Sequence, residues 1–150
     1  MEAQSGAFGV GVHPGLQRAY VSNRDTGTIN VFDTLTNTRL WPQTTPVGGM
    51  PYALAVDATR SRLYVLYALA GGTPDRVAVF SLAPSGASRI GTVPVEDGGV
   101  QGGTGIAVNP TTGHLFVANS ARNSVTVIDG PVMSVMATVP VGLDPGMLGI

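Results

Sequence analysis

The side chains that could perform chemistry are few in this sequence and lie far apart. There are two histidines, His13 and His114, no cysteine and no lysine, so the eight basic residues are all arginines. Without cysteine, disulfide bonds, thiolate metal ligands and covalent haem attachment are excluded. The sequence contains no Ser-His-Asp set, no P-loop and no glycine-rich nucleotide loop between a strand and a helix. We therefore predict no catalytic residue, no metal site and no cofactor, and we expect both histidines to be surface residues in turns.

A larger group of polar residues could instead bind a partner, because each lies in or beside an expected loop. Both signs of charge and several amides are present, which suits a protein or a small ligand. Ordinary solvated loops would have the same composition, and this alternative stays open. The candidate binding residues are Asn23, Arg24, Asp25, Asp75, Arg76, Glu96, Asp97, Gln101, Arg122 and Asn123.

The composition predicts one domain of ordinary size with a buried core. Hydrophobic residues make up 43% of the 150 positions, which is too apolar for a disordered chain. The 21 glycines and 11 prolines are spread along the chain, as expected for many tight turns. Charged residues are sparse, at 11% with a net charge of -1, so the basic patch that nucleic-acid binding needs is missing. No apolar stretch is long enough to span a membrane, and the first residues lack the pattern of a signal peptide.

The elements that must position the polar residues are short β-strands. Residues 102–142 contain four apolar runs, GIAV, HLFVAN, SVTVID and SVMATVPV, separated by turn signals such as Asn-Pro and Gly-Pro. Short runs rich in β-branched and aromatic residues, with regularly spaced turns, are typical of meandering antiparallel strands. Related runs occur twice upstream, so we predict an all-β chain. Its three four-stranded units cover about 8–48, 51–96 and 104–142, and the first strand of a further unit covers 146–150.

Equal spacing supports this repeat. The last valine of the first strand precedes the central valine of the second strand by nine residues in every unit, as in Val12 and Val21. The step from the second to the third strand is ten residues in two units and fourteen in the middle unit, which places four extra residues around 68–75. A period of about 40 to 50 residues with four strands per unit indicates a β-propeller. A β-sandwich is the alternative, and it offers no reason for equal spacings.

The repeat resembles that of the YVTN-repeat family of β-propellers, which is similar to the WD40 repeat. The family unit runs G-I-A-V-x-P, then Y-V-x-N, V-x-V-I-D and V-x-V-G-x-x-P. The second unit departs from it, with Tyr67 in place of the Asn and Ser81 in place of the Asp. The resemblance covers nearly the whole chain and implies a β-propeller fold. It also implies an exported or cell-surface bacterial or archaeal protein, periplasmic or extracellular, but it implies little about function. The matching segments are 105–110, 116–119, 125–129 and 139–145 in the third unit, and 13–14, 20–23, 29–33 and 46–48 in the first.

The recurring amides and carboxylates of this motif have a structural explanation. Asn23 and Asn119 end the second strand of their units, where we expect a left-handed backbone and hydrogen bonds to the loop. Asp33 and Asp129 end the third strand and are expected to accept hydrogen bonds from the following turn. These four residues are therefore predicted to shape turns and not to act as catalytic carboxylates.

The loops of a propeller divide between two faces, because the strands of each unit alternate in direction. Both length irregularities, 68–75 and 96–103, belong to the same face. Insertions on one face of a repeat protein commonly mark its binding side, and the candidate binding residues lie on this face. His13 and His114 fall on the opposite face and two units apart, so they are not expected to share a metal ion.

Three units are too few to close a propeller. If about 500 Å² of apolar surface stayed exposed on an outer face, about 12 kcal/mol of burial would be forgone. We therefore expect either a piece of a longer chain, whose remaining blades cover the outer faces, or two chains that form a six-bladed ring. Two classes of function remain: a non-catalytic scaffold for protein or ligand binding, which we favour, and part of a propeller enzyme, a lactonase, lyase or redox protein, with its catalytic residues in other blades.

Overall fold

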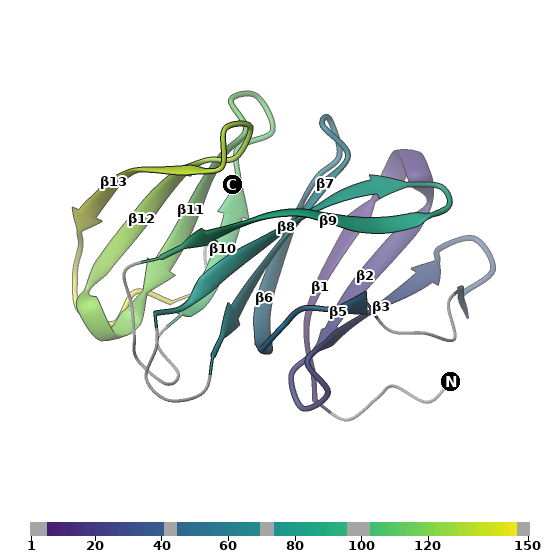
Figure 1. Ribbon diagram of the computed structural model, residues 1–150, viewed down its shortest axis with the longest axis horizontal. Helices are drawn as coiled ribbons and strands as arrows, with labels where there is room; N and C mark the ends of the chain where they lie inside the picture. The colour runs from purple at the N-terminus through teal and green to yellow at the C-terminus, as the bar shows by residue number, and fades with distance from the viewer. Residues whose placement is uncertain (1–5, 41–44, 70–73, 96–102, 147–150) are drawn as a thin grey trace.

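The computed structural model describes residues 6–40, 45–69, 74–95 and 103–146. It consists of three antiparallel β-sheets arranged side by side, so the predicted all-β fold of three four-stranded units is confirmed (Figure 1). The strand expected at 146–150 lies outside the described residues, apart from Gly146. In the part of the chain that the structure describes, no helix is long and apolar enough to cross a bilayer.

The strands of each sheet follow one another in the sequence. The first sheet has the order β1 (Ala7–His13), β2 (Arg18–Asn23), β3 (Thr28–Asp33) and β4 (Thr38–Arg39), and β5 (Thr45–Pro46) also pairs with β3. The second sheet has the order β6 (Met50–Asp57), β7 (Arg62–Ala68), β8 (Arg76–Ala83) and β9 (Gly86–Pro94). The third has the order β10 (Gly103–Val108), β11 (His114–Asn119), β12 (Ser124–Asp129) and β13 (Ser134–Pro140). Two short 3₁₀ turns, η1 (Pro14–Leu16) and η2 (Ser120–Arg122), lie in the connections.

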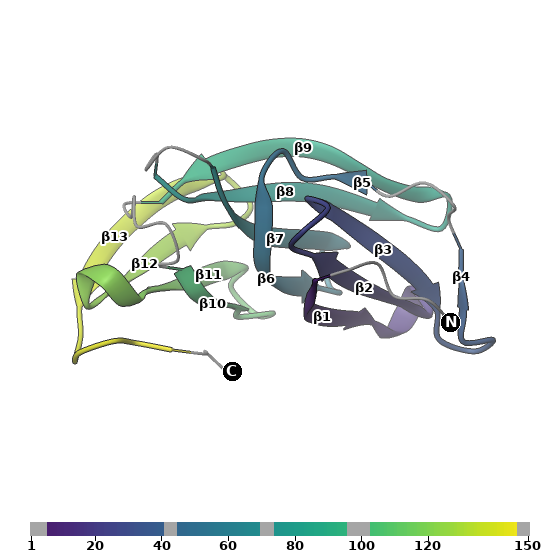
Figure 2. The same ribbon diagram turned by 90° about the horizontal axis from the view of Figure 1, so that it is seen from below.

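The sheets fan out from their first strands, as the blades of a propeller do (Figure 2). The first strand of the second sheet, β6, packs between β1 and β10 on the inner side of the arc, and β9 and β13 lie on the outer side. We call the contact between the first and second sheets the first junction, and that between the second and third sheets the second junction. Each junction buries an apolar core between two sheet faces.

Both cores are built from apolar side chains of neighbouring sheets. In the first junction Tyr20 and Val31 of the first sheet pack with Phe80 of the second. In the second junction Tyr64 of the second sheet packs with Leu115 of the third. All five side chains are at most 2% exposed. Burial of a large apolar side chain contributes about 1.5 to 3 kcal/mol, so the junctions hold the sheets together.

The three sheets share one register. The cross-strand pairs Val10 with Val21, Leu54 with Val65, and Ile106 with Val117 are equivalent, as the nine-residue spacing predicts. A β-bulge follows the start of the inner strand in each sheet, between residues 7 and 10, 51 and 54, and 103 and 105. Because a bulge changes the direction in which neighbouring side chains point, the side chains at the start of each inner strand do not follow the alternation of the rest of the strand.

Candidate functional site

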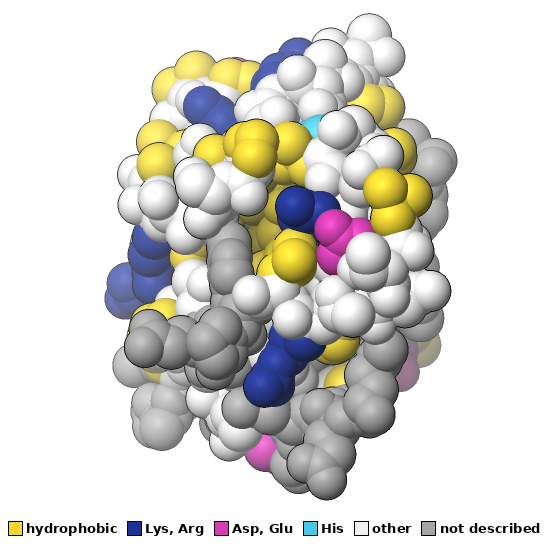
Figure 3. Space-filling view, turned by 90° about the vertical axis from the view of Figure 1, so that its right-hand side faces the viewer, with side chains coloured by type: hydrophobic (Ala, Val, Ile, Leu, Met, Phe, Trp, Pro, Cys, Tyr) yellow, Lys and Arg dark blue, Asp and Glu magenta, His cyan; other side chains and the backbone are white. Residues whose placement is uncertain are grey.

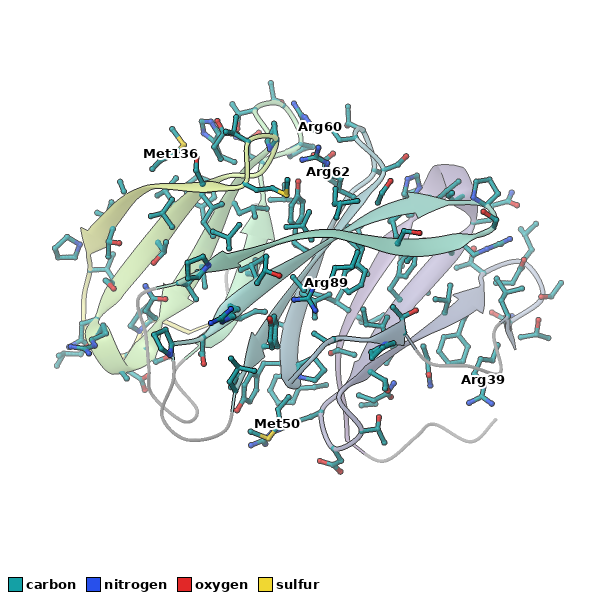
Figure 4. The ribbon with its side chains drawn as sticks, in the orientation of Figure 1. Arg39, Met50, Arg60, Arg62, Arg89 and Met136 are labelled. Atoms are coloured by element: carbon teal, nitrogen blue, oxygen red, sulfur yellow. The ribbon has the colours of Figure 1, made fainter. Side chains whose placement is uncertain are left out.

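The described candidate residues lie along the lower edge of the molecule in Figure 1. This lower face is formed by the β2–β3 turn, the described ends of the segment between β7 and β8, and η2 with the turn that follows it. Met50 lies on this side in Figure 4, whereas Arg60 and Arg62 lie on the opposite, upper face. The candidates Glu96, Asp97 and Gln101 lie outside the described residues, as do residues 70–73 of the insertion.

Asn23 is part of the framework of the lower face. Its side chain is fully buried, and its Nδ2 donates to Thr28 Oγ1 at 3.5 Å. The equivalent Asn119 donates to Ser124 Oγ at 3.1 Å and to Thr126 Oγ1 at 2.8 Å. Asn119 has φ -106°, so the left-handed backbone expected for this position is wrong, and the amides join two strands instead of bonding the loop. A partner could reach Asn23 only if the β2–β3 turn rearranged.

Asp75 and Asn123 anchor the outer end of their sheets through the backbone. The amide of Val95 donates to Asp75 O at 2.9 Å, and that of Val141 donates to Asn123 O at 2.8 Å. Gly27 O accepts the equivalent bond from Val47 in the first sheet. Asp75 is buried, and Asn123 has a left-handed backbone with φ 53° while its Oδ1 accepts from the Asp144 amide. Asp75 therefore acts through its main chain, and Asn123 through both its main chain and its side chain.

The remaining candidates present side chains that a partner could touch. Asp25, Arg76 and Arg122 are exposed, and Arg24 is half-buried. Asp25 and Arg24 belong to the β2–β3 turn, Arg76 begins β8, and Arg122 ends η2. The sheets thus bring charged residues from three connections to one face.

Arg24 lies in the most organised polar arrangement on this face. Its guanidinium carbon is 5.1 Å from the ring centroid of Tyr52, which belongs to β6 of the second sheet. Phe8 of β1 meets the same ring edge-on, with centroids 6.0 Å apart and an interplanar angle of 86°. A cation over an aromatic face contributes about 0.5 to 2 kcal/mol, so the first junction fixes the position of the guanidinium.

The hydroxyl group of Tyr52 is a second polar group in this arrangement, and it has unused hydrogen-bonding capacity. Tyr52 is 5% exposed, and its hydroxyl has no hydrogen-bond partner among the described residues. A buried hydroxyl without a partner costs about 1 to 3 kcal/mol. The Arg24 guanidinium can donate to an incoming acceptor, and a carboxylate is the group that it fits best, whereas the buried Tyr52 hydroxyl would have to become accessible before it could donate as well.

Phe8 and Tyr52 are not among the candidate binding residues predicted from the sequence. The register shows that both hold the same position in β1 and β6, two residues before Val10 and Leu54 and within the bulge. An aromatic residue at that position, in a strand otherwise rich in Gly and Ala, was the available signal. Its meaning depended on the bulge, which the spacing of the repeat did not predict.

The histidine of the upper face at the first junction, His13, has a structural role. His13 is buried, and its Nδ1 accepts from the Leu16 amide at 3.1 Å while its Nε2 lies 3.3 Å from Ser61 Oγ. The expectation that His13 is a surface residue is therefore wrong, because it caps the η1 turn at the first junction. Among the described residues, no three His, Asp or Glu side chains are grouped so that they could hold a metal ion.

Two tyrosines of the junction cores have raised pKa values because they are buried. Burial raises the pKa of Tyr20 and Tyr64, against a smaller lowering by nearby arginines, and both rings belong to the junction cores. Both tyrosines therefore stay neutral at physiological pH and serve packing.

The sheets, their fan and their shared register define a β-propeller repeat domain with WD40-like blades. No protein-family model matches the chain, and a search of the curated proteins finds no match. Among solved structures, the chain is similar to Kuenenia stuttgartiensis hydrazine synthase, with a TM-score of 0.78 and 23% identity over 98% of this chain and 40% of that one.

Two further solved structures have slightly lower TM-scores. The structure of U3-55K gives a TM-score of 0.75 at 15% identity, over 96% of this chain and 42% of that one. The WD40 repeats of RRP9 give 0.74 at 15% identity, over 96% and 41%. The chain thus spans about two fifths of the length of the solved chains it resembles, and at these identities the likeness shows the fold alone.

Proposed function

We propose that this chain is a non-catalytic β-propeller scaffold of the YVTN-repeat type that binds an acidic segment of a partner protein on its lower face. The observation that carries the proposal is the Arg24 guanidinium held over the Tyr52 ring at the first junction, where the Tyr52 hydroxyl has no hydrogen-bond partner among the described residues. Arg76 and Arg122 are also exposed on the same face, which carries the exposed Asp25 as well. An exported or cell-surface location belongs to the proposal through the resemblance to YVTN repeats.

Two features support this proposal: a hydroxyl group without a hydrogen-bond partner among the described residues, and a guanidinium that is already held in position. A fold that leaves a buried hydroxyl without a partner gives up about 1 to 3 kcal/mol, and a bound carboxylate would recover it. The guanidinium is already held over the Tyr52 ring, so little side-chain entropy is lost on binding. A rigid donor pair of this kind suits recognition, since neither group is placed to activate a nucleophile.

The proposal is tested by titrating the ¹⁵N-labelled protein with a peptide of alternating Glu and Gly and with its Gln and Gly counterpart. We expect amide shifts around Arg24 and Tyr52 with the acidic peptide alone. Arg24→Gln should abolish them, and Arg39→Gln, which changes an arginine on the far edge of the first sheet, should retain them.

Tyr52→Phe separates a binding role from a structural one. Removing the hydroxyl should weaken peptide binding while leaving the free energy of unfolding unchanged or higher, because no hydrogen bond to the described residues is lost. Loss of stability with unchanged binding would contradict the proposal. Hydrolysis of a panel of lactones and esters by the purified chain would overturn the non-catalytic part of the proposal.

A further inference from the structure

Each sheet has two faces that differ in what they pack against. The leading face of a sheet points toward the preceding sheet, and the trailing face points toward the following one. Leu54 and Val65 lie on the leading face of the second sheet and form part of the first junction. Tyr64 and Val79 lie on its trailing face and form part of the second junction. Every junction therefore joins a trailing face to a leading face.

The first sheet has a leading face that no described residue covers. Val10 is paired with Val21 as Leu54 is with Val65, yet Val10 is 67% exposed whereas Leu54 is 8% exposed. Val12 on the same face is 51% exposed. Figure 3 views the molecule from this side and shows hydrophobic side chains gathered near its centre. The face has the apolar character of a junction without a neighbouring sheet.

The trailing face of the third sheet is also apolar and is not covered by another sheet among the described residues. Phe116 pairs with Val127 as Tyr64 pairs with Val79, but Phe116 and Val127 are only half-buried. Val139, at the outer edge of this face, is 46% exposed. One chain therefore carries an uncovered face of each type, and the two types are the ones that pack together inside the molecule.

An arginine marks the leading face more specifically. In the second sheet Arg89 pairs with Phe80, and its guanidinium donates to Val47 O of the first sheet at 2.8 Å. In the first sheet Arg39 pairs with Phe32 in the same register. In Figure 4 Arg89 lies near the middle of the view and Arg39 at the outer edge, and Arg39 forms no hydrogen bond or ion pair with the described residues. Val141 of the third sheet is the equivalent of Val47, because both amides bond the same turn position.

We propose that a second copy of this chain covers both faces. The trailing face of one copy packs on the leading face of the other, as at the internal junctions, and Arg39 of one copy donates to the Val141 carbonyl of its partner. Each copy has one face of each type, so two copies satisfy all four faces in a closed ring of six sheets. A ring of six lies within the range of four to eight blades that propellers adopt.

The first test is the mass of the purified chain by light scattering over a concentration series. We expect twice the mass of one chain. Val10→Glu and Val139→Glu each place a charge on one face at an exposed position, so both variants should fold and be monomeric. Leu35→Glu, at a 68% exposed position in the β3–β4 turn, is the matched control and should remain a dimer.

Mixing the two face variants distinguishes the proposed contact from other dimers. The Val10→Glu chain keeps its trailing face and the Val139→Glu chain keeps its leading face, so the mixture should form a one-to-one complex through a single junction. Arg39→Gln should weaken the wild-type dimer about tenfold per junction. A monomeric wild type, as expected if further blades of a longer chain cover these faces, overturns the proposal. A dimer that persists in either face variant, or a mixture that stays monomeric, overturns it as well.

Discussion

At the first junction β1 approaches β6 so closely that Gly11 has no room for a side chain, whereas at the second junction the equivalent residue is Ala55, packed in the core. A Cβ on Gly11 would lie 2.5 Å from Leu54 Cδ1 and 2.9 Å from Val56 Cγ2. Ala55 has the same register and faces the third sheet with 9% of its surface exposed. The small residues of these strands therefore set the distance between neighbouring sheets.

The polar contacts at the two junctions differ more than the cores do. At the second junction Arg60 donates to Pro110 O at 3.0 Å and Thr111 O at 3.1 Å, and Arg62 donates to Gly130 O at 2.7 Å. At the same edge of the first junction, His13 and Ser61 form one side-chain contact. Equivalent apolar faces therefore determine which sheets pack together, whereas different polar contacts stabilise the edges of the two junctions.

The largest expected effect tests whether the cores are equivalent. Phe80 at the first junction and Ile128 at the second hold the same register, and both are 0% exposed. We expect Phe80→Ala to lower the free energy of unfolding by about 3 to 5 kcal/mol and Ile128→Ala by about 2 to 5 kcal/mol in urea titrations. Leu35→Ala, at an exposed turn, should change it by less than about 0.5 kcal/mol. A small effect at either buried position would mean that its junction contributes little to folding.

The next prediction breaks the arginine contacts of the second junction. Arg60→Ala removes the two cross-junction hydrogen bonds and the 3.0 Å ion pair with Asp57, whose side chain is fully buried. We expect a loss of about 2 kcal/mol in unfolding free energy, measured by thermal or urea denaturation. His13→Ala at the first junction should cost about 1 kcal/mol, and Arg76→Ala at an exposed position close to nothing. Equal losses for Arg60 and His13 would remove the difference between the two edges.

A smaller effect probes the distance between the sheets. Gly11→Ala forces Leu54 or Val56 to move, so we expect a loss of about 1 to 2 kcal/mol by overpacking. Ala55→Gly removes a methyl group from the second junction and should cost about 1 kcal/mol. The measurement is the urea midpoint of each variant with an unchanged slope. An Ala at position 11 that stabilises the chain would show that the first junction has free space.

The smallest expected effect concerns Asp33, which lies away from both cores. Hydrogen bonds from the backbone N–H groups of Thr36 and Leu35 hold the pKa of this carboxyl below its usual value of 3.8. Because the pKa is lower in the folded state, the stabilisation is present above pH 4 or so and is lost as the pH falls through the folded-state pKa. Asp33→Asn should flatten the acid limb of the stability curve in chemical denaturation. A variant with the same acid dependence as the wild type would assign that limb to other carboxyls.

The sequence predicted the architecture because the architecture depends on local lengths. Equal connections between the first and second strands put Val21, Val65 and Val117 in one register, and the turn-capping role of Asp33 and Asp129 follows from their position after a strand. Asp33 Oδ1 accepts from the Leu35 amide at 2.9 Å, and Asp129 Oδ1 accepts from the Val132 amide at 2.9 Å. Both predictions are confirmed.

Features that depend on contacts between neighbouring sheets could not be predicted from local spacing in the sequence. The placement of Tyr52 beside Arg24 requires both the bulge of β6 and the approach of the first sheet. The burial of His13 depends on Ser61, 48 residues away. Asn23 and Asn119 matched a turn pattern, but hydroxyl groups on the adjacent strand offered better partners for their amides.

Because each sheet is made of consecutive strands, the molecule can assemble in the order in which it is synthesised. The first sheet can pair once residue 33 has emerged, but Tyr20 and Val31 find their partners only when Phe80 follows. At about 5 to 20 residues per second, that interval lasts roughly 2 to 10 seconds. During this interval the apolar trailing face of the completed sheet is exposed to solvent. The rate of translation therefore determines how long chaperones and other chains can bind to each nascent blade.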